Sequence, residues 1–260
     1  MADPKQELVP AESKAIGKPL ASFIDQDDTT GKTGIAANEI TLPRLALAQG
    51  TSAEMQPDGS AYLPDLRLFE MFNNLTGESY GRGPLKFIAI KRRSLHIEFD
   101  PNDRNIPLDL DVPSDDPRTQ WSKDPETGKG IAPAATHFVE FIIMLVKKDA
   151  PPEPLILSIK CTNKWNRKAA ERLTMFMIST RGPSFAGFRF VESKTEKNDQ
   201  GTFAVWSVRN GGMMEEGDEQ LYRQAKVFSA SLEGKTINVK REGAEDASFD
   251  VDEMERESGM

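Results

Sequence analysis

The segment HFVEFIIMLVKKDAPPEPLILSIKC, residues 137–161, decides the fold class of this chain. Its first ten residues form the most apolar run in the sequence and predict a buried central strand. Prolines at 151, 152 and 154 exclude a helix before LILSIKC, residues 155–161. We therefore predict that the two apolar runs pair as a hairpin at the centre of a sheet.

Directly after this hairpin, the period of the apolar pattern changes from two residues to 3.6 residues, which is typical of an amphipathic helix. The stripe consists of Trp165, Ala169, Leu173, Phe176 and Met177. The helix is expected to begin after an N-cap at Thr162 or Asn163 and to end near RGP, residues 181–183. A second stripe predicts another helix at about 218–232.

The other strands are expected on both sides of the first helix. Before it lie an extended segment at 40–49, a turn or tight hairpin at 72–81, and either two strands or one long bent strand at 85–99. A long irregular excursion at 100–136 follows, and two more strands, 185–193 and 201–209, come after the helix. We predict a mainly β chain with interspersed helices (α+β). An oligonucleotide-binding (OB)-like barrel, with one helix between strands and a C-terminal helix, suits this order, and other α+β folds stay open.

The distribution of charge suggests three parts. Residues 1–38 contain few large apolar groups and are expected to be a flexible arm. Residues 39–241 are expected to form the folded domain. Residues 242–260 contain eight carboxylates and a single arginine, so they hold −7 of the net charge of −8. We interpret them as a disordered acidic tail, either regulatory or merely solubilising.

Composition excludes several classes of protein. A single cysteine, Cys161, rules out an intramolecular disulfide, and the two histidines, His96 and His137, cannot form a zinc cluster with it. No secretion signal or membrane span is evident, so a cytoplasmic protein is expected, in the host cell if a phage encodes it. Motifs of hydrolases and phosphate loops are missing, so we expect no catalytic residue, no cofactor and no metal. The acidic run at 109–116 leaves a divalent-cation site open as an alternative to a solvated loop.

Basic and aromatic residues gather in three clusters, although the chain is acidic overall. The first cluster contains Arg82, Lys86, Phe87, Lys91, Arg92 and Arg93. The second contains Lys160, Lys164, Trp165, Arg167 and Lys168, and the third contains Phe188, Arg189, Phe190, Trp206 and Arg209. Single-stranded nucleic acid is bound by this combination, because cations contact the phosphates and rings stack on bases. For each residue the competing interpretation is structural: a core ring, or a solvated cation.

Three segments resemble parts of a known family. ITLPRLALAQGTSAEM, followed by FNNLTGESYGRGPLKFIAIKRRSLHIEF, resembles the opening of a family of bacteriophage and prophage proteins, and LILSIKCTNKWNRKAAERL resembles a later strand-to-helix junction. The resemblance implies an OB-fold, single-stranded DNA-binding protein of phage replication and recombination. Tails in that family often end in an aromatic residue that binds partners, whereas this chain ends SGM, with Phe249 eleven residues inside.

From the clusters and the resemblance together, we predict a sequence-tolerant single-stranded DNA-binding protein without catalytic activity. Its acidic tail would contact replication or recombination proteins, it would not bind membranes, and it could form a homo-oligomer. The main alternative is a phage accessory protein that binds other proteins and no nucleic acid. A metal-dependent nuclease that uses the loop at 109–116 is a third hypothesis.

Overall fold

The computed structural model describes residues 41–102, 106–199, 201–233, 236–239 and 247–250, so the predicted arm at 1–38 lies outside the described residues. Within these residues the α-helices are α1 (Lys164–Ile178) and α2 (Glu219–Ser231). The strands are β1 (Thr41–Leu42), β2 (Arg44–Leu47), β3 (Met71–Asn73), β4 (Ser79–Gly81), β5 (Leu85–Phe99), β6 (Pro107–Asp109), β7 (Ser122–Lys123), β8 (Gly130–Ile131), β9 (Ala135–Leu145), β10 (Glu153–Lys160), β11 (Gly187–Asn198), β12 (Gly201–Met213), β13 (Thr236–Val239) and β14 (Ala247–Asp250).

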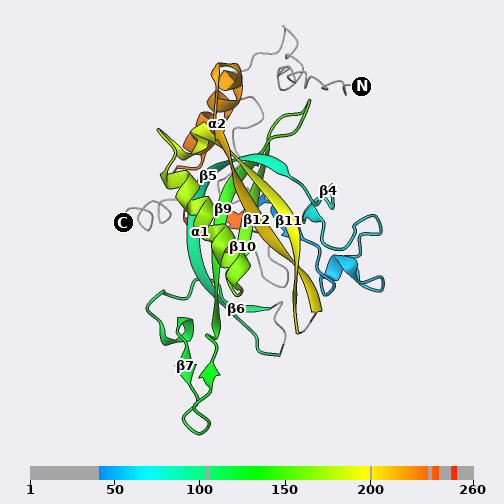
Figure 1. The fold of residues 1–260 in the computed structure, drawn as a ribbon, viewed down its shortest axis with the longest axis vertical. Helices are drawn as coiled ribbons and strands as arrows, with labels where there is room; N and C mark the ends of the chain where they lie inside the picture. Colours follow the sequence, from blue (N-terminus) through cyan, green and yellow to red (C-terminus); the bar gives the residue numbers. More distant parts are fainter. Residues whose placement is uncertain (1–40, 103–105, 200, 234–235, 240–246, 251–260) are drawn as a thin grey trace, which may run out of the picture.

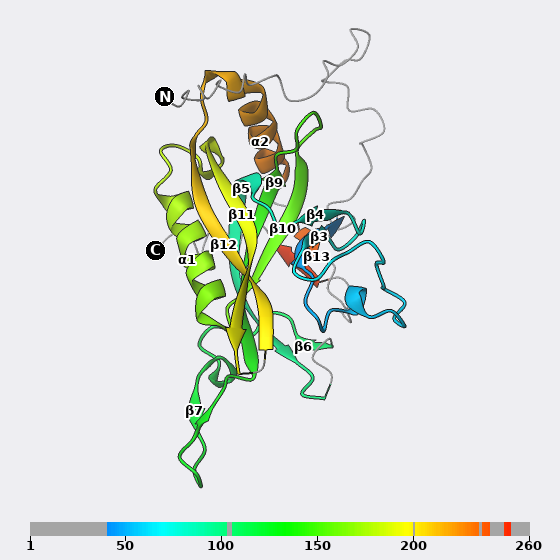
Figure 2. The ribbon, with the colours of Figure 1, turned by 45° about the vertical axis from the view of Figure 1, so that its right-hand side comes forward.

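Most strands belong to one curled sheet that forms a half-barrel (Figure 1, Figure 2). Its order is β12-β11-β5-β9-β10-β2-β3-β4, and β6 pairs with the end of β5. Strands β9 and β10 form the predicted hairpin, with Leu145 opposite Glu153 and Phe138 opposite Lys160. Strand β2 runs parallel to β10. The prediction of a mainly β chain with two helices is confirmed. In the described part of the chain this sheet has nine strands, whereas an OB barrel has five.

The two faces of the sheet are covered by different helices, because successive residues of a strand point to opposite faces. On one face Phe141 of β9 and Leu157 of β10 pack with Leu173 of α1. On the other face Ile142 of β9 packs with Leu221 of α2. Burial on both faces explains why the segment at 137–146 is apolar almost throughout and does not alternate with polar residues.

Side-chain amides of Asn166 and Gln49 join the two sides of the curled sheet. Helix α1 contacts both β10 and β12, which are four places apart in the sheet order, so it lies across the open side of the half-barrel. Asn166 of α1 donates from Nδ2 to the carbonyl oxygen of Lys160 (3.1 Å), and its Oδ1 accepts the N–H of Trp206 (3.0 Å). Gln49 pairs in the same way with both backbone groups of Ala204, at 2.9 and 3.0 Å. These bonds occupy the edge of β12, where backbone groups would otherwise lack partners.

Residues 85–99 form one long strand, β5. Of the two alternatives for this segment, one long bent strand is therefore confirmed and two separate strands are not. The pairing of β5 with β9 shifts between Ala89 and Lys91, where a bulge inserts one residue. After the bulge, Arg92 faces α1 and donates to Thr174 (3.1 Å), whereas Arg93 faces the opposite side and forms an ion pair with the buried Glu140 (3.2 Å). The basic run KRR is therefore divided between two faces of the sheet.

The long excursion after β5 is organised by one arginine. Arg118 donates to Glu98 (2.6 Å), Asp109 (3.1 Å) and Asp116 (2.8 Å), and the side-chain and backbone hydrogen bonds that it donates to Asp116 lower the pKa of that carboxyl to about 2. Beyond it, the β7–β8 hairpin projects from the body of the protein (Figure 1). Two carboxylates of the run at 109–116, considered above as cation ligands, thus bind a guanidinium instead.

A small second sheet has the order β1-β13-β14. Strand β13 is parallel to β1, and β14 is antiparallel to β13. Within the predicted tail, 242–260, only Ala247–Asp250 are among the described residues, as strand β14, and the rest of the tail lies outside them. The backbone of this acidic segment is therefore placed two strands from β1, which Pro43 alone separates from β2.

Candidate nucleic-acid interface

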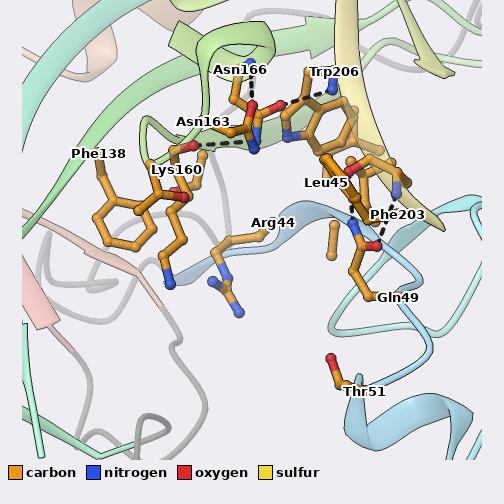
Figure 3. Close-up of a pocket in the computed structure, with 15 residues that line it drawn as sticks. Arg44, Leu45, Gln49, Thr51, Phe138, Lys160, Asn163, Asn166, Phe203 and Trp206 are labelled. Carbon is orange, nitrogen blue, oxygen red and sulfur yellow. Dashed lines mark hydrogen bonds between the residues drawn. The ribbon is translucent and has the colours of Figure 1, made fainter. Parts of the chain in front are cut away.

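A pocket of about 420 Å³ lies where the half-barrel is closed by α1, between the end of β10 and the edge of β12 (Figure 3). We call it the mouth pocket. It is lined by Arg44, Leu45, Ala46, Leu47, Gln49, Thr51, Phe138, Ser158, Lys160, Thr162, Asn163, Asn166, Phe203, Ala204 and Trp206. Its walls thus come from segments that are far apart in the sequence but that the curl of the sheet brings together.

Two cations belong to this pocket. Arg44 comes from β2, and the exposed Lys160 ends β10. Figure 3 shows their charged ends on the same side of the pocket, away from the amides of Asn163 and Asn166. Strand β2 pairs in parallel with β10, and Arg44 lies opposite Ile156. Ile156 and Lys160 are separated by an even number of residues on β10, so Arg44 lies on the same sheet face as Lys160. Parallel pairing therefore places two positive charges along one rim of the pocket.

The first turn of α1 forms the opposite rim. Asn163 is the N-cap: its Oδ1 accepts the backbone N–H of Asn166 (2.8 Å), so of the two candidate caps the structure has Asn163. The first N–H groups of a helix have no partner within the helix, and its dipole adds partial positive charge at this end. This rim is therefore a helix N-terminus, and the exposed cation Lys164 lies next to it in the first turn of α1.

Aromatic rings stand beside these cations. Trp165 is half-buried and meets the half-buried Phe203 edge to face, with ring centroids 5.7 Å apart. The ammonium of Lys164 lies 4.6 Å from the ring centre of Trp165, and that of Lys160 lies 5.9 Å from the ring centre of Phe138. A ring that is half-buried keeps one side for a base, while a neighbouring ammonium can contact a phosphate.

The second predicted cluster is brought together at or beside this pocket. Lys160 lines it, while Lys164 and Trp165 belong to the first turn of α1 next to it. Arg167 and Lys168 follow on the exposed side of the same helix, and Arg167 lines a second pocket described below. Of the third cluster, Trp206 reaches the mouth pocket, but it is only 5% exposed and belongs to the core around α1.

The first predicted cluster is not brought together. Arg82 donates to the carbonyl oxygen of Leu68, and Lys86 lies over the ring of Phe188, 3.4 Å from its centre. Phe87 is 0% exposed and belongs to the core, so it has no free face for a base. Lys91 lies in β5 just after the bulge, and Arg92 and Arg93 diverge as described above. We therefore leave Phe87 out of the interface.

In the rest of the third cluster the residues have different roles. Phe188 is 3% exposed and packs under α2. Arg189 is 2% exposed and donates to the carbonyl oxygens of Phe176 and Phe188 and to Thr180 and Asn210, so it ties the end of α1 to β11 and β12. Both side chains are structural. Phe190 and the exposed Arg209 remain a surface pair, with the guanidinium 5.4 Å from the ring centre.

Of the lining residues, sequence reasoning had included only Lys160 and Trp206, and it missed the cation Arg44 and the rings of Phe138 and Phe203. Arg44 lies in the extended segment predicted at 40–49, and its alternation with Leu45 is a signal that could have placed it on the face opposite to that of Leu45. Phe138 was included in the apolar run at 137–146, and Phe203 in the strand at 201–209. No local signal connects the three, because β2, β9 and β12 meet only when the sheet curls.

Cys161 is buried, and burial raises the pKa of its thiol to about 11, which is typical of a core thiol rather than a nucleophile. Within the described residues, neither α1 nor α2 has the length and apolar character needed to cross a membrane.

Comparison with known proteins finds one family. A family model described as Pam3 phage gp34-like protein matches residues 11–238 of the chain. No curated protein and no solved structure matches it.

Proposed function

The chain belongs to the Pam3 phage gp34-like protein family, a family of phage proteins, and on this premise we propose that it binds single-stranded DNA without strong sequence preference and without catalysis. The mouth pocket is the observation that carries the proposal. There Arg44 and Lys160 stand on one rim, the first turn of α1 on the other, and Phe138 and Phe203 line the wall.

The mechanism follows from the chemistry of these groups. The cations and the helix N-terminus would contact phosphates, which releases condensed counterions and makes affinity fall with salt. The half-buried rings of Trp165 and Phe203 would stack on bases, and stacking is tolerant of sequence because every base has a π face. A phosphate at the N-terminus of α1 would also offset the repulsion between the helix dipole and the first-turn cations Lys164, Arg167 and Lys168.

We also propose that the sheet is OB-like. Support comes from its curl, from the helix inserted between β10 and β11, and from the position of the pocket at the open side of the half-barrel. Oligonucleotides bind an OB fold, a partly open barrel, on one strand face and its adjoining loops. The additional strands β2, β3 and β4 extend the sheet beyond β10 and provide Arg44.

The acidic tail is proposed to compete with DNA for the same cations. The position of β14, two strands from β1, supports this proposal, because β1 leads directly into β2 and Arg44. Once DNA displaces the tail, its carboxylates would be available to replication or recombination proteins in the host cytoplasm. Formation of a homo-oligomer on the strand is a further part of the proposal.

The test is fluorescence anisotropy of a labelled 20-nucleotide oligo(dT), titrated with protein at several salt concentrations. We expect log K to fall linearly with log[salt], and the variant Lys160→Gln to reduce the magnitude of the slope by about 0.7, the value for one lost phosphate contact on a single strand. Lys226→Gln, an exposed lysine on α2 away from the pocket, is the charge-matched control and should leave the slope unchanged.

Two results would argue against the proposal. Absence of binding at low salt would favour the alternative of a phage accessory protein that binds only other proteins. Binding that Lys160→Gln and Lys226→Gln weaken equally would separate DNA binding from the mouth pocket.

A further inference from the structure

A second pocket, of about 310 Å³, lies on the other side of the same strand ends. His137 and Cys161 line it, whereas their neighbours Phe138 and Lys160 line the mouth pocket. Successive side chains of a strand point to opposite faces, so the two pockets flank the ends of β9 and β10. The second pocket, which we call the α1 pocket, is lined by Arg92, His137, Val139, Cys161, Arg167, Ala170, Glu171, Thr174 and Met175.

One part of the α1 pocket is positively charged. Arg92 donates from Nε to Thr174 Oγ1 (3.1 Å), which orients the plane of its guanidinium, and the exposed Arg167 approaches from the helix. The pKa of His137 is lowered to about 4, first by burial and then by the charges of His96, Arg92 and Arg167. Glu171 is the only carboxylate among the lining residues. The local charge therefore favours an anion.

The other part is apolar. Val139 and Ala170 form its floor from the core, and Met175, 59% exposed, stands at its edge. A methionine is flexible and polarisable, and it packs well against flat aromatic systems. The volume is at the lower end of the range of about 300–1,000 Å³ for small-ligand sites, which suits one nucleotide better than two.

We propose that the α1 pocket holds a single nucleotide unit, with its phosphate at Arg92 and Arg167 and its base against Val139, Ala170 and Met175. This inference rests on the proposed function and extends it. A DNA strand bound in the mouth pocket would turn around the junction between β10 and α1, at Thr162 and Asn163. It would then place one unstacked nucleotide in the α1 pocket. Cations on both sides of this junction, Lys160 and Arg167, would then follow consecutive parts of one backbone.

The two histidines of the chain provide a direct measurement, because imidazole NMR signals can be assigned with the variant His137→Gln. We expect oligo(dT) of 20 nucleotides to shift the signals of His137 and to raise its pKa, because a phosphate near an imidazole favours the protonated form. The charged groups that face His137 are His96 and Arg92 on β5 and Arg167 on α1. Ser94 shares a hydrogen bond with His137 Nε2 (2.9 Å).

A matched pair of variants isolates the phosphate contact. Arg167→Gln should weaken oligo(dT) binding about fivefold and lower the magnitude of the salt slope by about 0.7, as one lost phosphate contact would. Arg172→Gln removes the same charge from an exposed position of the same helix that does not line the pocket, and should change affinity less than about twofold. Met175→Ala, at an exposed position, tests the base contact without disturbing the core.

The outcomes are distinguishable. One outcome is that oligo(dT) binds in the anisotropy titration, the NMR signals and pKa of His137 do not change, and Arg167→Gln and Arg172→Gln bind oligo(dT) with equal affinity. In that case the α1 pocket is not used, although the proposed function stands. If thymidine monophosphate shifts His137 and oligo(dT) does not, the pocket takes a free nucleotide and the subsite on the strand is refuted. If oligo(dT) does not bind at all, both proposals fail.

Discussion

Replacing Asn166 by alanine should destabilise the protein by opening the closure of the half-barrel. The Asn166 amide joins the two sides of the sheet, through Lys160 on β10 and Trp206 on β12, and the side chain is 8% exposed. The Trp206 N–H is buried, so its loss of a partner should cost about 1–3 kcal/mol. Lys160 is exposed, so water can replace the amide at its carbonyl oxygen, and that loss should cost about 0.5–1.5 kcal/mol.

The sum, about 3 kcal/mol, corresponds to a fall in Tm of about 6–12 °C for a protein of this size. Urea unfolding followed by circular dichroism measures the free energy of unfolding, and a scan measures the Tm. Asn163→Ala is the matched control at the same helix end: it removes only the N-cap bond to Asn166, so we expect a loss of about 1 kcal/mol.

Gln49→Ala tests the same closure independently, because Gln49 pairs with Ala204 on the same edge of β12. If the amides of Asn166 and Gln49 together hold the edge of β12, the loss of unfolding free energy in the double variant should differ from the sum of the two single losses by more than about 0.5 kcal/mol. A change of less than about 0.5 kcal/mol in the Asn166→Ala protein, within the range of ordinary surface substitutions, would refute the view that these amides close the sheet.

Three further predictions concern the tail, pH and the core. Neutralising Asp252, Glu253, Glu255 and Glu257 to amides should tighten oligo(dT) binding at low salt and leave it unchanged at high salt, and equal affinity at both salts would leave the tail without a competitive role. Because the folded pKa of His137, about 4, lies below its ordinary 6.5, the unfolded chain binds a proton first as the pH falls, so stability is lost from about pH 6.5 down to pH 4. His137→Gln should therefore flatten the urea-measured stability curve in that window, and a curve parallel to that of the unaltered protein would contradict the assignment. Arg189→Met should cost about 2–4 kcal/mol in urea unfolding, because the carbonyl oxygens of Phe188 and Phe176 lose the hydrogen bonds that the buried guanidinium donates. Arg209→Met, at an exposed position, should cost less than about 0.5 kcal/mol, and equal losses for the two arginines would contradict the structural role of Arg189.

The elements were predictable because their signals are local. The apolar run at 137–146, the prolines after it and the stripe from Trp165 to Met177 identified β9, β10 and α1, and the N-cap was one of two adjacent residues. The long β5 was predictable only as an alternative, because the bulge between Ala89 and Lys91 reverses the alternation and resembles a break between two strands.

Site residues were predictable only in part. The basic residues around α1 are local in sequence, so Lys160, Lys164 and Trp165 could be grouped with the pocket that they border. Arg189 and Phe87 could not be separated from surface residues, because a cation or ring in an alternating strand has the same pattern whether it faces solvent or the core. Burial of Arg189 depends on acceptors at Phe176 and Thr180, which belong to another element.

The sequence by itself determined which segments are strands and helices, where charge is concentrated, and that the chain is mainly β, since these properties depend on neighbours within a few residues. The tertiary structure alone decided which cations meet. Parallel pairing of β2 with β10 places Arg44 on the same sheet face as Lys160, and the curl of the sheet brings Phe203 of β12 to the same pocket. Long-range pairing and curl depend on how whole strands pack on α1 and α2, and no local pattern encodes that packing.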